Sequence, residues 1–259
     1  MTGFREIELG LAGGIGNPIF FYDNLPSTND FAKAHLKDFT HGTVIAANLQ
    51  TAGRGQGDNI WFSPAGKGLY FSIVLKPDNR LEELQLLTLM AALALKRGIE
   101  EIAEAQSVQP QVIDIKWPND LLHNDRKLAG ILVEGVFHRE KMGIIAGIGL
   151  NITDNTAEIP EELKGKITSL EEIYGIIWDS EIVLEYLLRS FSEYYRNFNP
   201  EAIVEDYVSS CRIWGRKGTL STQEKEYRGI CRTISRRGEL ILGMEQGDKT
   251  FISGTLRMD

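Results

Sequence analysis

An apolar period of three and four residues over residues 81–105 places the strongest constraint on the fold of this chain. The apolar positions along this segment are Leu84, Leu87, Met90, Ala91, Ala94, Leu95 and Ile99. Because residues three and four apart share one face of a helix, the spacing predicts an amphipathic α-helix. Runs of β-branched and aromatic residues lie before it, at 69–75, and after it, at 112–117. We therefore expect a long helix packed on a sheet.

The pattern of short runs predicts two structural units. Further strands are expected at 20–22, 44–48, 128–137 and 144–150, a helix capped by Ser27, and helices at 180–198 and 200–210. From Ile213 onward only short β runs remain, at 217–221, 226–235, 239–244 and 250–256. We therefore predict an α+β fold with a mixed-sheet domain, residues 1–206, and a small barrel-like β domain, residues 207–259. The glycine-rich segment 10–16 lacks the Lys-Ser/Thr pair of a P-loop and is expected to be a flexible leader.

Composition and charge exclude several classes of function. The 28 basic and 36 acidic residues give a net charge of −8, which argues against nucleic-acid binding, because DNA binders gain affinity by neutralising phosphates. No apolar run approaches the roughly 20 residues that a membrane span needs, and the N-terminus is not a basic leader. Two cysteines, Cys211 and Cys231, cannot build a disulfide framework or a zinc site. We expect a cytoplasmic protein that binds neither membranes nor nucleic acid.

The segment 53–61 is the first candidate for chemistry. Its glycines at every second position let backbone N–H groups turn toward an anion, and Arg54 adds a forked cationic donor. Trp61 in such a polar segment needs a flat partner to bury it, and a nucleotide base is one. A solvated hairpin loop is the alternative interpretation.

The stretch Lys116-Trp117-Pro118-Asn119-Asp120 is the second candidate, and Lys127 follows it closely. A lysine at the end of a buried strand is an unusual place for a charge unless an anion meets it there. The alternative is a lysine that reaches the surface and pairs with Asp114 or Asp120.

Taken together, these segments resemble the biotin protein ligases. The matching stretches occur in the family's order and at its spacing: Ser27-Thr28-Asn29, residues 50–55, 61–64, 68–72, 116–120, 126–134 and 147–151. Each stretch alone is weak, but the ordered set is specific and covers nearly the whole chain. The resemblance implies a class II synthetase-like catalytic domain, shared by biotin and lipoate ligases, and a C-terminal SH3-like barrel.

The resemblance also implies a reaction. Biotin attacks the α-phosphate of MgATP to give biotinyl-5′-AMP and pyrophosphate, and a lysine of a biotin carboxyl carrier protein then displaces AMP. ATP, with Mg²⁺ carried on its phosphates, is the expected cofactor, the protein supplies no metal site of its own, and the assembly is a monomer or a homodimer.

Roles for individual residues follow from the same resemblance. The catalytic residues are expected to be Arg54, Lys116, Lys127 and Asp120, the last helping to deprotonate the acceptor lysine. The biotin-binding residues are expected to be Ser27, Thr28, Asn29, Gln50, Gly53, Arg54, Gly55, Gln56, Lys127 and Gly130. The residues that bind ATP and the adenylate are expected to be Trp61, Lys116, Asn119, Lys127 and Asn151.

The sequence departs from the well-known bacterial members at Gln56, which replaces a second arginine, so retention of the adenylate is left open. About 26 residues precede Ser27, fewer than a helix-turn-helix domain needs, so we expect a monofunctional ligase. A lipoate or octanoate attachment enzyme and a non-catalytic sensor of the adenylate are the alternatives. Octanoyl transfer needs a cysteine nucleophile, and both cysteines lie outside the catalytic domain.

Overall fold

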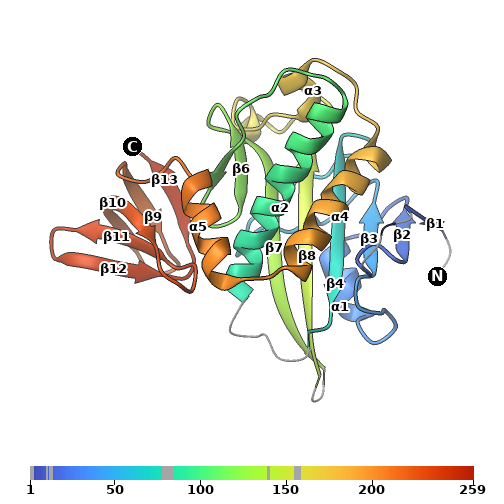
Figure 1. Cartoon of the computed structure of the whole chain (residues 1–259), viewed down its shortest axis with the longest axis horizontal. Helices are drawn as coiled ribbons and strands as arrows, with labels where there is room; N and C mark the ends of the chain where they lie inside the picture. The colour runs from blue at the N-terminus through green and yellow to red at the C-terminus, as the bar shows by residue number, and fades with distance from the viewer. Residues whose placement is uncertain (1–2, 10, 12–13, 78–83, 139–140, 155–158) are drawn as a thin grey trace.

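The larger of the two structural units is built on an eight-stranded mixed sheet, whose strands lie in the order β1-β2-β3-β4-β8-β7-β6-β5 (Figure 1). The computed structural model describes residues 3–9, 11, 14–77, 84–138, 141–154 and 159–259. The strands are β1 Phe4–Ile7, β2 Ile19–Tyr22, β3 Val44–Ala47, β4 Gly68–Leu75, β5 Asp114–Lys116, β6 Asp120–His123, β7 Arg126–His138 and β8 Lys141–Asn151. Strands β2 and β3 are parallel, and the other neighbours are antiparallel.

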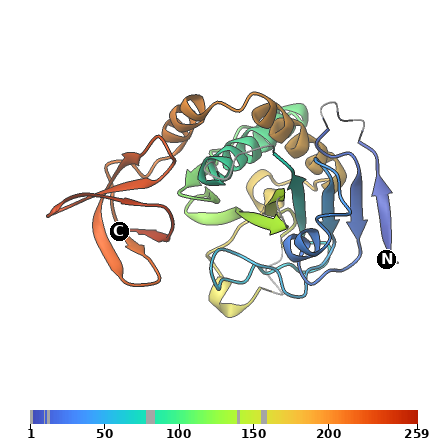
Figure 2. The ribbon, with the colours of Figure 1, turned by 90° about the horizontal axis from the view of Figure 1, so that it is seen from below.

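Helices cover the two faces of this sheet unequally. The long helix α2, Leu84–Ala105, lies on one face with α4, Ser180–Arg196, and α5, Pro200–Ser210, while the short helix α1, Thr28–Ala34, lies on the other (Figure 2). The expected long helix packed on a sheet is therefore confirmed. Helix α1 begins after Ser27, whose hydroxyl accepts the N–H of Asp30 at 3.3 Å, as its sequence predicted.

The alternation of side chains along β4 gives the sheet one apolar face and one face that carries polar groups. Leu69, Phe71 and Ile73 join the buried apolar layer under α2, whereas Ser72 and Val74 point to the face that carries α1. Successive residues of a strand point to opposite faces, so one strand supplies both a core and a polar surface.

Four elements were not predicted from the sequence: β1, β6, the short 3-10 helix η2, Glu161–Leu163, and the short helix α3, Leu170–Tyr174. Strand β1 is an exposed edge with one buried residue, and β6 is short and partly polar, so neither gives a strong periodic signal. The leader prediction is wrong where the segment is described, because Ile15 is buried and Gly16 donates its N–H to Gly42 O at 2.8 Å. Residues 10, 12 and 13 lie outside the described part.

The C-terminal β unit is a five-stranded antiparallel sheet in the order β12-β11-β10-β9-β13. Its strands are β9 Lys217–Ser221, β10 Glu226–Ile234, β11 Leu240–Met244, β12 Gly247–Phe251 and β13 Thr255–Met258. The single run predicted at 250–256 is therefore divided between two strands. Helix α5 spans the proposed boundary between residues 206 and 207.

The β10–β11 turn packs against the larger unit through hydrogen bonds. Gly238 O accepts the indole N–H of buried Trp117 at 3.0 Å and the amide of Gln85, on α2, at 3.3 Å. Arg212 also pairs with Asp114 at 3.0 Å. Among the described helices, none is both long and apolar enough to span a membrane.

The close approach of α2 and α4 generates a stability prediction. A Cβ on Gly98 would lie 3.1 Å from both Leu187 Cα and Tyr186 O, which are backbone atoms of α4. We expect Gly98→Leu to lower the free energy of unfolding by about 1–3 kcal/mol, because the helices must separate. Urea unfolding measures this, with Glu104→Leu as the control that adds the same side chain to the exposed face of α2. Equal stability of the two variants would contradict the packing argument.

Candidate active site

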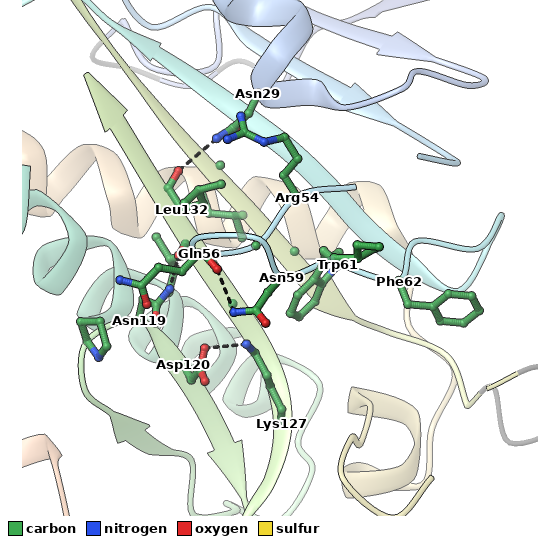
Figure 3. Close-up of a pocket in the computed structure, with 18 of the residues that line it drawn as sticks. Asn29, Arg54, Gln56, Asn59, Trp61, Phe62, Asn119, Asp120, Lys127 and Leu132 are labelled. Carbon is green, nitrogen blue, oxygen red and sulfur yellow. Dashed lines mark hydrogen bonds and ion pairs between the residues drawn. The ribbon is translucent and has the colours of Figure 1, made fainter. Parts of the chain in front are cut away.

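A cavity of about 300 Å³ opens on the face of the sheet that carries α1. Its walls come from the start of α1, the segment after β3, the β5–β6 turn, the first half of β7 and the C-terminal end of β8 (Figure 3). Of the residues singled out in the sequence, the following line it: Ser27, Thr28, Asn29, Gln50, Arg54, Gly55, Gln56, Trp61, Lys116, Asn119, Asp120, Lys127, Gly130 and Asn151. Gly53 is not among the lining residues, and its carbonyl instead accepts the N–H of Trp61 at 2.9 Å.

Neutral polar side chains gather at one end of the cavity. Ser72, from β4, places its hydroxyl 2.6 Å from Asn29 Oδ1 and 2.8 Å from Thr28 Oγ1. Gln50 Oε1 accepts the backbone N–H of Thr28 at 2.8 Å, and Gln50 Nε2 donates to Ser63 at 2.9 Å. These cross-links hold the side chains in fixed orientations, as a site for an uncharged polar ligand requires.

Three glycines form the floor of the cavity. In the register of β7 and β8, Gly130 faces Gly149. A Cβ on Gly147 would lie 2.1 Å from Asn29 Oδ1, and one on Gly149 would lie 2.4 Å from the indole ring of Trp61. Only glycine leaves room for these two side chains against the sheet. One side of the Trp61 indole ring therefore packs against the backbone of the sheet at Gly149.

Positively charged side chains occupy the other end. Lys127 lies 5.1 Å from the centre of the Trp61 ring and pairs with Asp120 at 2.7 Å. Lys116 is largely buried, and among the described residues no carboxylate lies within ion-pair distance of it. Burial lowers the pKa of Lys116, Asp120 opposes this, and Lys127 adds to it. The ion pair with Asp114 or Asp120 that was the alternative for Lys116 is not formed.

Arg54 lies at the rim, and its guanidinium is held by two carboxylates. It contacts Asp30 at 2.6 Å and Glu134, on β7, at 3.1 Å. Beyond Arg54, the glycine-rich segment folds back on itself, since Gly55 donates its N–H to Asn59 O at 2.7 Å. In this structure Arg54 therefore ties the segment to the sheet at the rim of the cavity, while Lys116 and Lys127 lie at its cationic end.

Two asparagines use their amide nitrogens on backbone carbonyls. Asn119 donates to Ile131 O at 2.6 Å, and Asn151 donates to Thr168 O at 3.0 Å and to Lys127 O at 3.3 Å. Their amide oxygens remain as the acceptors that a ligand can meet.

Several lining residues were missed by the sequence analysis. Gly254, Thr255 and Leu256, on the C-terminal unit, close the cavity beside Lys116, and Arg257 is near enough to lower the pKa of that lysine further. No local pattern marks them, because they meet the cavity only through tertiary packing. Leu163 and Ile167 add an apolar wall that has no signature either. Gly147 and Gly149 interrupt an otherwise aliphatic strand, and this local signal could have placed them in the floor.

The cavity can therefore hold one elongated ligand or two ligands end to end. Its polar end suits an uncharged group with donors and acceptors, the glycine floor admits flat groups, and its cationic end attracts phosphate or carboxylate. Such a site can bring two anions together while lysines neutralise the charge that develops between them. This is the site of an enzyme that activates an acid.

A family model identifies the class. The biotin/lipoate A/B protein ligase family matches residues 21–151, about half of the chain. The chain belongs to the biotin/lipoate A/B protein ligase family.

Individual relatives extend this match over nearly the whole chain. It is 34% identical to the bifunctional ligase/repressor BirA of Bacillus subtilis (strain 168), over 98% of this chain and 78% of that protein. It is 30% identical to the biotin–[acetyl-CoA-carboxylase] ligase of Mycobacterium tuberculosis, over 82% and 76% of the two chains. The structure of the biotin protein ligase from Aquifex aeolicus in complex with biotin and ATP superposes with a TM-score of 0.79, 32% identity, and 93% and 99% coverage. The predicted fold class is confirmed.

The polar end of the cavity generates a second stability prediction. Ser72→Ala should lower the free energy of unfolding by about 1–3 kcal/mol, because Asn29 Oδ1 stays buried after losing a donor. Ser190→Ala is the matched control, since this serine is equally buried and its hydroxyl has no partner among the described residues. Chemical denaturation of both variants measures the difference. A loss of stability in Ser190→Ala as large as in Ser72→Ala would refute the assigned network.

Proposed function

We propose that this chain is an ATP-dependent biotin protein ligase. It activates biotin as biotinyl-5′-AMP with release of pyrophosphate, and then transfers biotin to a lysine of a biotin carboxyl carrier protein. The observation that carries the proposal is the two-ended cavity, in which a neutral, cross-linked polar end and a lysine-rich end meet over one glycine floor.

The polar end is assigned to the ureido ring of biotin. That ring is uncharged and offers both N–H donors and a carbonyl acceptor, so it needs groups of both kinds. Ser27, Thr28, Asn29 and Gln50 carry hydroxyl and amide groups that provide them. The dithiolane ring of lipoate has no comparable hydrogen-bonding groups and would leave these side chains unpaired, which favours biotin over lipoate.

The lysine-rich end is assigned to the bond-forming step. The carboxylate of biotin must approach the α-phosphate of ATP, and Lys116 and Lys127 neutralise the charge that two approaching anions create. Asp120 holds Lys127 at 2.7 Å and so fixes where that charge sits. When bound, Mg²⁺ supplies further charge neutralisation on the phosphates. In this proposal it enters with ATP, and the amide oxygen of Asn119 stands at the phosphate end.

The nucleotide base is assigned to Trp61 and Asn151. The indole of Trp61 offers a flat surface, and the amide oxygen of Asn151 can accept from the amino group of adenine, because its nitrogen is used on Thr168 O and Lys127 O. Guanine carries a carbonyl at the same position, so this acceptor favours ATP over GTP.

The transfer step needs a neutral acceptor lysine. An unperturbed lysine is charged at neutral pH, so a carboxylate near the acyl group helps to remove its proton. Asp120 is the acidic residue among the described lining residues and is proposed for this role. Cys211 and Cys231 are buried and are not among the lining residues, which counts against an acyl-cysteine mechanism.

Incubation of the purified chain with biotin, MgATP and a biotin carboxyl carrier domain tests the proposal directly. We expect streptavidin to detect labelled carrier, and lipoate offered in parallel to give little product. Lys127→Ala should slow biotin-dependent pyrophosphate release at least about tenfold, because one of the two neutralising charges is lost. Absence of label with biotin would defeat the proposal, and a Lys127→Ala rate within about twofold of wild type would defeat the role of that lysine.

The buried position of Lys116 generates a pH prediction. A lysine attracts phosphate only while protonated, and burial lowers the pKa of Lys116 below its ordinary 10.5. We therefore expect kcat/KM for MgATP in biotin-dependent ATP–pyrophosphate exchange to fall as the pH rises through that lowered pKa. This assay contains no acceptor protein, so the titration of the acceptor lysine does not contribute to the pH profile. Lys116→Arg stays charged and should move the fall to higher pH. An unchanged alkaline limb in Lys116→Arg would exclude Lys116 as its source.

A further inference from the structure

The carboxylate of Glu134, on β7, is not among the residues that line the cavity, yet it contacts two residues that do and a lysine of α1. It accepts the amide of Asn29 at 2.8 Å, pairs with Arg54 at 3.1 Å, and pairs with Lys33 at 2.6 Å. Its side chain is 19% exposed, so these contacts are only partly screened by water. One side chain therefore connects the polar end of the cavity with the glycine-rich segment above it.

The first contact fixes which way the amide of Asn29 points. A carboxylate only accepts hydrogen bonds, so the Nδ2 group of Asn29 must face Glu134, where it also donates to Leu132 O at 3.2 Å. Its Oδ1 must then face the hydroxyl of Ser72, 2.6 Å away. The hydroxyl of Ser72 must therefore donate to Asn29 rather than accept from it. A neutral amide in place of Glu134 could donate or accept, so only the longer bond to Leu132 O would then hold the Asn29 amide in this direction.

The second contact fixes the segment over the cavity. Arg54 begins the stretch that folds back to Trp61, and the backbone N–H of Trp61 donates to Gly53 O at 2.9 Å. Trp61 in turn lies against Gly149 in the floor. Glu134 thus anchors the start of the glycine-rich segment through Arg54, and Asp30 shares this anchor.

We propose that Glu134 is a positioning residue for biotin recognition, whose carboxylate sets the orientation of the Asn29 amide and ties the glycine-rich segment to the sheet through Arg54. The proposal rests on the proposed function, because it concerns the substrate assigned to this cavity. It predicts that Glu134 affects recognition of biotin more than recognition of ATP, since Lys116 and Asn151 are not among its partners.

The chain offers a matched control in Asp30. Asp30 also contacts Arg54, at 2.6 Å, and Lys33, at 3.5 Å, but the contacts of its carboxylate do not include Asn29. Glu134→Gln and Asp30→Asn therefore each remove one negative charge from the same two cations, and they differ in whether the Asn29 amide loses its fixed acceptor. Comparing them separates amide orientation from the loss of charge.

Steady-state ATP–pyrophosphate exchange with biotin and MgATP varied separately tests the proposal. We expect Glu134→Gln to raise KM for biotin at least about tenfold and KM for MgATP less than about twofold, and Asp30→Asn to raise KM for biotin less than about threefold. A purely structural defect would change both KM values or the amount of active enzyme. A biotin KM within about twofold of wild type in Glu134→Gln, or an equal rise in Asp30→Asn, would overturn the proposal.

A double-mutant cycle tests whether Glu134 acts through Asn29. If it does, Glu134→Gln should change KM for biotin less than about twofold in an Asn29→Ala background, because the amide that it orients is already absent. Additive effects of the two substitutions would overturn this coupling. Glu134→Asp keeps a carboxylate, which only accepts hydrogen bonds. Its KM for biotin should therefore lie between those of wild type and Glu134→Gln, and a KM as high as that of Glu134→Gln would count against the proposal. Failure of the wild-type chain to activate biotin would instead refute the proposed function, so the two failures are distinguishable.

Discussion

The pleat of β7 and β8 is the constraint on which the rest of this molecule depends. On one face these strands present aliphatic side chains such as Ile131 and Ile148, which pack in the apolar layer that contains α2. On the opposite face, neighbouring positions carry glycine, and the sheet is hollow there. A strand alternates its faces by geometry, so the same segment builds the core and opens the cavity. Any substitution that fills the floor must displace Asn29 or Trp61.

Charge is distributed to match this hollow. The catalytic part of the chain is strongly acidic, yet its cavity ends in Lys116 and Lys127, with Arg54 at the rim. A small cluster of cations inside an acidic domain favours one nucleotide and one carboxylate over a long polyanion. Burial lowers the pKa of Lys116 because it removes water from around the ammonium group. The same loss of water reduces screening, so the protonated lysine attracts phosphate more strongly.

Most of the residues singled out by the resemblance line one cavity. Ser27, Gln50, Trp61 and Asn151 come from distant parts of the chain and meet around one cavity. Arg54 shows where sequence reasoning stops. Its place in the glycine-rich segment was readable, but its contacts with Asp30 and Glu134 were not, because those partners are brought to it by α1 and β7.

Local periodicity and composition were enough to predict the α+β class, the long amphipathic helix, the change to short strands near Ile213 and the motifs around the cavity. Neither periodicity nor composition predicted the edge strand β1, the division between β12 and β13, or the part that Thr255 plays in lining the cavity. Those features depend on which surfaces meet after the chain has folded. Local patterns cannot specify them, since the pairing of distant segments depends on contacts that form only in the folded chain.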